Sequence, residues 1–172
     1  RTAEKLRPLV YISLGTVIHD RRRFCRNCAA ALADMDADAV LSVGTADNLR
    51  ALGTLPPNIQ AEERVDQLAV LQQADVFLTH CGMNRASEAI WYGVPTVLDP
   101  QQSEEAAVAA RMEELGLGLR LPTEVPEDIR KALETVLENP AYQERTERIA
   151  RSFQAAGGAK AAAEYILSGG RQ

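Results

Sequence analysis

Short apolar runs alternate with stretches of helical periodicity along most of the chain. Apolar runs without polar alternation are typical of strands buried on both faces, as in parallel sheets. The predicted strands are 9–14, 39–43, 58–61, 76–79, 96–98 and 117–121. Helical patterns at about 22–35, 65–73, 84–93 and 104–115 separate most of them, and a polar loop is predicted around Asn48. Strands joined by helices through right-handed crossovers predict an α/β fold with a doubly wound parallel sheet.

After the last predicted strand the chain becomes helical. Apolar stripes recur at helical spacing, and Pro140 and Gly157–Gly158 separate the segments that carry them. The stripes consist of Ile129, Leu133, Val136 and Leu137, then Tyr142, Ile149 and Phe153, then Tyr165 and Ile166. The sequence contains no internal repeat and no clear boundary, so we interpret 1–172 as a single domain with extra C-terminal helices.

The segment from Thr79 to Glu88 carries the most specific chemistry. A buried strand ends there in a glycine turn, and a helix begins near Asn84 and ends at Gly93. The free N–H groups at a helix N-terminus can hold an anion. His80 in the turn suits a phosphate, and Glu88, one helical turn further on, suits a sugar diol. This combination indicates a site for a nucleoside diphosphate.

Two other segments are expected near this turn. In open α/β sheets, ligands bind at the carboxyl ends of the strands, where the strand order switches. Gly15–Thr16 follows the first predicted strand, and Asp99–Glu105 follows the fifth. A single crevice could therefore collect both segments together with His80–Asn84.

Composition narrows the classes of partner. The chain has 172 residues and a net charge of −5, which argues against a nucleic-acid binder with a basic face. No apolar run is long enough to span a membrane, and no signal peptide is recognisable. The chain begins with Arg1, and we interpret it as a piece of a longer protein.

The three cysteines do not indicate a disulfide framework, because their number is odd. We therefore expect a cytoplasmic location. Cys25 and Cys28 could be half of a zinc or redox motif, but Phe24, Cys28, Leu32 and Met35 share one helical face. A packing role for both thiols is favoured over metal or redox chemistry.

Four segments in this order resemble a known family. They are Ile12–Thr16, Val65–Leu71, His80–Gly93 and Pro100–Glu105. Together they resemble the C-terminal, donor-binding half of family 1 glycosyltransferases of the Rossmann-like GT-B fold, and in particular bacterial macrolide-type glucosyltransferases. The resemblance extends from about Pro8 to Leu167. It implies a UDP-hexose donor such as UDP-glucose, inverting transfer to a hydroxyl of a small lipophilic acceptor, and no metal cofactor.

The resemblance also implies a role for individual residues. His80 would bond the donor pyrophosphate, and Glu88 would accept from the ribose hydroxyls. The remaining implied contacts are Gly82, Met83 and Asn84 with phosphate, Arg64, Val65 and Gln67 with uracil and ribose, Glu104 and Glu105 with the sugar hydroxyls, and Gly15 and Thr16 with the sugar and phosphate end.

No residue of this chain is expected to be the catalytic base. In the family, that base is a histidine of the N-terminal acceptor domain, which would be this domain's partner. His19, in the loop after the first strand, is not a candidate. The chain alone is therefore expected to bind donor and to transfer nothing.

Several positions depart from the family pattern. Arg64 stands where an aromatic residue usually stacks on the base, and Asp66 where proline is usual. Arg85 replaces a serine or threonine beside the phosphates, Glu105 replaces a glutamine, and Ala109 an asparagine. Arg85 could strengthen anion binding or point to solvent. A carboxylate only accepts hydrogen bonds, so the contact of Glu105 with the sugar would change its sense.

Each of these residues could also have a purely structural role. Glu88 could simply pair with Arg85 at helical spacing. Arg21–Arg23 is interpreted as a solvated face, and Trp91 as a core residue with Ile90. For the whole chain, the alternatives are a non-catalytic nucleotide-binding module, the donor-binding subunit of a two-chain glycosyltransferase, or, more remotely, a nucleotide-sugar epimerase of similar architecture. The choice between UDP and dTDP stays open.

Overall fold

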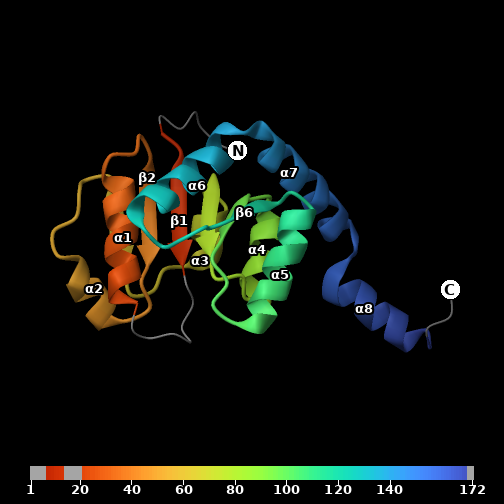
Figure 1. Cartoon of the computed structure of the whole chain (residues 1–172). Coiled ribbons are helices and arrows are strands. Elements are labelled where there is room, and N and C mark those ends of the chain that lie inside the picture. Colours follow the sequence, from red (N-terminus) through yellow and green to blue (C-terminus); the bar gives the residue numbers. More distant parts are fainter. Residues whose placement is uncertain (1–6, 14–20, 170–172) are drawn as a thin grey trace.

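Six parallel strands form one sheet (Figure 1). The computed structural model describes residues 7–13 and 21–169. The strands are β1 (Leu9–Ser13), β2 (Asp38–Ser42), β3 (Ile59–Glu62), β4 (Val76–Thr79), β5 (Thr96–Leu98) and β6 (Gly118–Arg120). Their order is β3-β2-β1-β4-β5-β6. The predicted doubly wound α/β fold is confirmed.

Helices connect and extend the strands. They are α1 (Arg22–Ala33), α2 (Ala46–Leu52), α3 (Gln67–Leu71), α4 (Met83–Tyr92), α5 (Ser103–Glu114), α6 (Pro126–Glu138), α7 (Pro140–Ala155) and α8 (Gly158–Leu167). Proline at the first turn of α6 and of α7 suits positions where no backbone N–H is needed. The predicted extra C-terminal helices are therefore present.

One face of the sheet packs against α1 and α6. Val10 and Ile12 of β1 share a core cluster with Cys25 and Cys28 of α1 and with Leu133 of α6. Both cysteines are buried free thiols. Burial raises the pKa of Cys25 to about 11. The packing interpretation of the Cys25–Cys28 motif is confirmed.

The other face packs against α3, α4 and α5. Alternation along β1 turns Tyr11 to this face, where its ring stacks on that of Phe77 with centroids 4.7 Å apart. Leu71 of α3 and Ala89 of α4 belong to the same cluster. Helix α7 covers α4 from outside, and Gln143 Nε2 donates to the Gly93 carbonyl at 3.1 Å.

The predicted polar loop around Asn48 is wrong, because this segment contains α2. Thr45 caps the helix, with its side chain accepting from Asn48 N at 3.2 Å. The Asn48 amide in turn donates to the Val43 carbonyl at 2.8 Å, and Asn48 is 1% exposed. The helix presents few apolar residues, so its periodicity is weak, and capping and tertiary contacts decide its structure.

The predicted core position of Trp91 is also wrong, since this side chain is 43% exposed. The buried residues of α4 are Ala86 and Ala89. At about 100° per residue, Trp91 lies about 200° around the helix from Ala89 and faces away from the sheet.

Helix α8 lies away from the sheet layers (Figure 1). Tyr165 and Ile166 are exposed, so the third predicted stripe builds no core with the described residues. Within the described part of the chain, no helix has the length and apolarity needed to cross a bilayer.

Candidate functional site

The carboxyl ends of four strands are aligned in register. Ser13 of β1 pairs with Ser42 of β2 on one side and with Thr79 of β4 on the other, and Thr79 pairs with Leu98 of β5. The connection from β1 leads toward β2, whereas β4 lies on the opposite side of β1. The segments after β4 and β5 therefore leave the sheet next to the switch in strand order, where such folds bind ligands.

The turn after β4 is strained and held by local bonds. Cys81 has a φ of 69°, which is uncommon for a residue with a side chain. Thr79 Oγ1 accepts from Cys81 N at 3.2 Å, and Cys81 Sγ contacts the Thr79 carbonyl oxygen at 3.5 Å. Cys81 is buried, so the turn presents His80 and Gly82 rather than the thiol. Strain of this kind is often found at ligand-binding turns.

Helix α4 begins without a side-chain cap. Its N-cap residue is Gly82, the first turn holds no acidic residue, and no side chain among the described residues caps its amides. Ala86 N is the first amide whose hydrogen bond closes a helical turn, to the Gly82 carbonyl. The amides before it are available to an anion, and the helix dipole favours negative charge there.

His80 lies against this helix start. It is 8% exposed, and its Nε2 is 3.7 Å from Glu105 Oε1. Its Nδ1 is buried and has no hydrogen-bond partner among the described residues. Burial lowers the pKa of His80, an effect that Glu105 opposes and Arg85 reinforces. A neutral imidazole is therefore favoured at pH 7, and it carries one N–H group that can donate a hydrogen bond to a ligand.

Gly82 makes room for this histidine. A Cβ at position 82 would stand 2.8 Å from His80 Nε2, closer than real side chains approach. The φ of Gly82 is −57°, which any residue can adopt. A side chain at this position is therefore compatible with the backbone but would displace the imidazole of His80.

Arg85 brings an unpaired cation to the same helix turn. Its Nε is buried without a hydrogen-bond partner, and Arg85 forms no ion pair with the described residues. The guanidinium acts on the pKa of both Tyr11 and His80, so it lies near both. The alternative in which Arg85 pairs with Glu88 is not what the structure has.

Glu88 instead accepts a hydrogen bond from Gln67. Gln67 Nε2 donates to Glu88 Oε2, and Gln67 Oε1 accepts from the Tyr11 hydroxyl at 3.3 Å. Gln67 begins α3, which Asp66 caps by accepting from Ala69 N at 3.1 Å. The structure therefore brings Gln67 and Glu88 together, and Tyr11 joins them although no motif in the sequence singles it out.

The start of α5 faces His80 through Glu105. This side chain is 5% exposed, and its Oε2 accepts from the backbone N of Gln101 and of Gln102 at 2.8 and 3.0 Å. Glu105 thus caps its own helix, and only Oε1 faces His80. Glu104 is exposed at the same helix start. Their predicted contacts with a sugar stay predictions.

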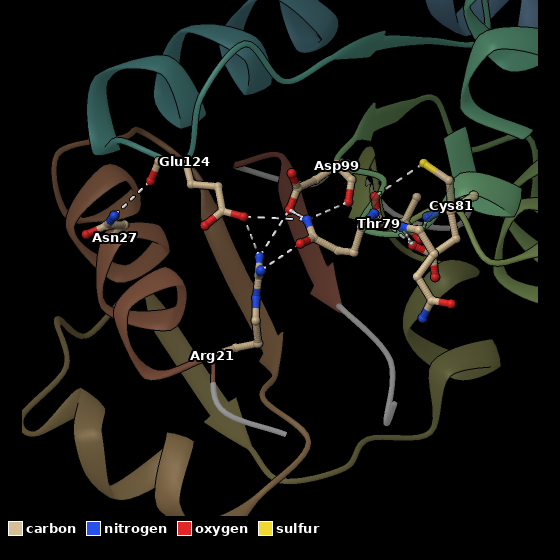
Figure 2. Close-up of polar contacts among 9 residues, drawn as sticks. Arg21, Asn27, Thr79, Cys81, Asp99 and Glu124 are labelled. Carbon is tan, nitrogen blue, oxygen red and sulfur yellow. Dashed lines mark hydrogen bonds and ion pairs between the residues drawn. The ribbon is translucent and has the colours of Figure 1, made fainter. Parts of the chain in front are cut away.

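A partly buried ion-pair cluster lies beside the segment that leads into α5 (Figure 2). Arg21 Nη2 contacts Asp99 Oδ2 at 3.2 Å and Glu124 Oε1 at 2.7 Å, and Arg21 Nη1 donates to Gln101 Oε1 at 2.8 Å. The Arg21 guanidinium also lies over the Phe24 ring, 4.5 Å from its centroid. The prediction that Arg21 belongs to a solvated face is wrong, although Arg22 and Arg23 are exposed.

This cluster perturbs Asp99. Burial and the Glu124 carboxylate raise the pKa of Asp99 to about 6, against the opposing effect of Arg21. Gln101 Nε2 donates to the same Asp99 carboxylate at 2.8 Å. The segment between β5 and α5 is thus tied to the start of α1 and to the loop before α6.

The other predicted contacts fall in different environments. Met83 and Asn84 are exposed at the start of α4, Arg64 is exposed, and Val65 is half-buried. Gly15 and Thr16 lie outside the described residues, as does His19. Within the described ranges, no group of three or more His, Cys, Asp or Glu side chains could hold a metal ion. The absence of a metal requirement stays a prediction.

Sequence comparison assigns most of the chain to one family. Residues 26–163 match the profile described as "Erythromycin biosynthesis protein CIII-like, C-terminal domain". The "NDP-glycosyltransferase YjiC" of Bacillus subtilis is 36% identical over 162 residues, which is 93% of this chain and 41% of that protein. The "Uncharacterized UDP-glucosyltransferase YojK" of the same organism is 32% identical over 95% of this chain and 41% of its own length.

Solved structures agree in fold. The calicheamicin glycosyltransferase CalG4 matches with a TM-score of 0.86 and 36% identity, over 94% of this chain and 42% of that protein. The chain therefore spans about two fifths of the length of these relatives.

Proposed function

The chain belongs to the family of C-terminal domains of erythromycin biosynthesis protein CIII-like proteins, and on that premise we propose that it is the nucleotide-sugar-binding half of an inverting glycosyltransferase. The proposed donor is a UDP-hexose such as UDP-glucose. The acceptor would be a hydroxyl of a small lipophilic molecule, bound mainly by an N-terminal domain. A single domain over residues 1–172 and a cytoplasmic location are part of the same proposal.

One observation supports the proposal: three kinds of hydrogen-bond donor lie near the start of α4, where an anion could use them. They are the uncapped amides of α4, the imidazole of His80 and the guanidinium of Arg85, whose Nε has no hydrogen-bond partner among the described residues. A diphosphate carries enough charge and enough acceptor oxygens to use all three, and charge-assisted hydrogen bonds are the strong ones. A neutral ligand would leave the guanidinium without a counter-charge.

The rest of the donor follows from the direction of α4. Glu88 lies one helical turn beyond the phosphate site, at a distance suited to the ribose, and its carboxylate could accept from both hydroxyls. Arg64, Val65 and Gln67 would then frame the base. The hexose would extend the other way, toward Glu104 and Glu105 at the start of α5, with Gly15 and Thr16 beside it.

This arrangement suits departure of a nucleoside diphosphate. When the sugar is transferred, negative charge grows on the β-phosphate, and fixed donors aimed at that charge lower the barrier without a metal ion. Inversion requires a base that activates the acceptor hydroxyl opposite the leaving group. We assign that base to the N-terminal domain, so this chain binds donor and does not transfer it.

A non-catalytic nucleotide-binding module is the second candidate, as is a donor-binding subunit of a two-chain enzyme. Glu105 favours the non-catalytic reading, because its Oε2 already caps α5 and a carboxylate has no proton to donate to a sugar. In the longer protein, Glu105→Gln combined with Arg85→Ser would separate the readings. A large gain in transfer would indicate a decayed site, whereas a loss would indicate that the present residues are used.

Calorimetric titration of the 172-residue chain with UDP, UDP-glucose and dTDP tests the proposal. We expect binding of UDP and UDP-glucose, and a loss of about tenfold or more with His80→Ala, the worth of a hydrogen bond to a charged group. His19→Ala, at the other histidine of the chain, is the matched control and should bind as wild type. Failure of all three nucleotides to bind would overturn the proposal.

A further inference from the structure

We propose that Tyr11 is a positioning residue for nucleotide binding. Through Gln67 it orients the carboxylate of Glu88, and it thereby sets the preference for ribose over 2′-deoxyribose in the donor. This inference rests on the proposed function, in which Glu88 accepts hydrogen bonds from the ribose hydroxyls.

Three elements meet in this chain of hydrogen bonds. Tyr11 comes from the central strand β1, Gln67 from α3 and Glu88 from α4. The Tyr11 hydroxyl contacts Gln67 Oε1 at 3.3 Å, and Gln67 Nε2 contacts Glu88 Oε2. The two contacts link the sheet to the proposed ribose site through a single amide.

The direction of both hydrogen bonds follows from the chemistry of the groups. A carboxylate only accepts, so the Gln67 group facing Glu88 must be the amide nitrogen. The Gln67 oxygen then faces Tyr11, whose hydroxyl must donate. Burial raises the pKa of Tyr11 above its ordinary value, so the phenol keeps the proton that it donates. The amide of Gln67 can satisfy both neighbours in one orientation only.

Tyr11 is the rigid end of this chain. It is 1% exposed, and its ring stacks on Phe77 at 4.7 Å between centroids with 11° between the planes. Helix α3 has only five residues, and so short a helix has little stability of its own. The Tyr11 hydroxyl therefore supplies the fixed point that the half-buried Gln67 side chain needs.

Glu88 is the end that would face the ribose. It is half-buried on α4, it does not form the alternative ion pair with Arg85 among the described residues, and Gln67 contacts its Oε2. Two neighbouring hydroxyls can both donate to a carboxylate only when its plane is correctly turned. Loss of the Tyr11 hydroxyl would release Gln67, then Glu88, without removing any atom that touches the nucleotide.

The test compares the affinities of UDP and 2′-deoxy-UDP for wild type, Tyr11→Phe and Glu88→Ala. Wild type should prefer UDP by about tenfold, the worth of one hydrogen bond to a charged group. Tyr11→Phe keeps the stacked ring. We expect it to lower the affinity for UDP by about three- to tenfold and the affinity for 2′-deoxy-UDP by less than about twofold. A merely structural role of Tyr11 would lower both affinities equally.

The matched control is Tyr92→Phe. This tyrosine ends the same helix α4, and its hydroxyl accepts from Gln72 rather than contacting Glu88. Its removal should leave the ratio of the two affinities unchanged. Gln67→Leu provides a second route to the same result if Tyr11→Phe folds poorly, because Gln67 is not a core residue.

The outcomes separate this inference from the function on which it rests. A wild-type chain that binds none of UDP, UDP-glucose and dTDP would overturn the proposed function. A Glu88→Ala variant that keeps the full preference for UDP would overturn the ribose role of Glu88 and, with it, this inference. If Glu88→Ala abolishes the preference while a folded Tyr11→Phe variant retains it, only the role of Tyr11 is overturned. Collapse of the preference in Glu88→Ala and in Tyr11→Phe supports the inference, and Gln67→Leu replaces Tyr11→Phe in this comparison only where Tyr11→Phe does not fold.

Discussion

A single added methyl group at Gly82 should disable the phosphate site without unfolding the protein. Alanine at this position would place its Cβ 2.8 Å from His80 Nε2. The imidazole must then rotate away, since the backbone of the turn is held by the bonds between Thr79 and Cys81. The φ of −57° is compatible with alanine, so the backbone itself is not strained.

The size of the effect follows from what is lost. A hydrogen bond to a charged phosphate is worth about 1.5–3 kcal/mol, so UDP affinity should fall about 10- to 100-fold. The free energy of unfolding should change by less than about 1 kcal/mol, because reduced chain entropy in the unfolded state offsets part of the collision. Calorimetric titration measures the affinity, and urea unfolding measures the stability.

The double variant refutes or supports the reasoning. In a His80→Ala background the imidazole is absent, so Gly82→Ala has nothing to displace and should cost no further affinity. Neighbouring residues that act through one contact show this kind of non-additivity. Independent, additive losses at the two positions, or wild-type affinity in Gly82→Ala alone, would show that the glycine does not position the histidine.

Three further predictions concern charged groups. Arg85→Ser should weaken the binding of UDP by about tenfold and reduce the salt dependence of that binding. Arg50→Ser, at an exposed arginine, should change neither. An equal loss of affinity in Arg85→Ser at low and at high salt would contradict a phosphate contact. Arg21→Ala should lower the free energy of unfolding by about 3 kcal/mol, because it leaves the buried Asp99 carboxylate without its ion-pair partner. Arg7→Ala, at an exposed ion pair, should lower the free energy of unfolding by less than about 1 kcal/mol. Similar urea midpoints for the two variants would be inconsistent with a buried ion pair between Arg21 and Asp99. The pKa of Asp99 rises in the folded state from its ordinary 3.8 to about 6, so its protonated form stabilises the fold below about pH 4, and this contribution is lost as the pH rises through about 6. Asp99→Asn should therefore show a flatter fall of stability from pH 4 to pH 7 than wild type, and parallel curves would rule out the shift.

The strands and the phosphate turn could be predicted from the sequence because local pattern decides them. Strands buried on both faces read as continuous apolar runs, and β4 and β5 begin and end as predicted. Two glycines mark the ends of α4 in the sequence. Gly82 stands at its start, and Gly93, in the left-handed conformation, stands at its end. The chemistry of His80 and Glu88 is visible because both lie within this one local unit.

Helix α2 and the exposure of Trp91 were missed for a common reason. Both depend on which side of an element the rest of the protein covers. A short or mixed pattern of apolar and polar residues does not indicate that side. Asn48 looks like a loop residue until its amide reaches the Val43 carbonyl. Ala86 and Ala89 of α4 are buried because they join the core clusters formed with the sheet, and the position of that face relative to Trp91 is set by how α4 packs on the sheet.

The sequence by itself determined the succession of strands and of most helices along the chain, and the residues that a nucleotide could use, because periodicity and turn chemistry act over a few residues. The tertiary structure alone decided the partners of those residues. Arg21 contacts Asp99 and Glu124 far along the chain, Tyr11 reaches Glu88 through Gln67, and Arg85 has no ion-pair partner in the part of the chain that the structure describes. These contacts depend on a strand order in which β1 lies beside β4, and bringing such distant segments together is a property of the whole sheet rather than of any segment within it.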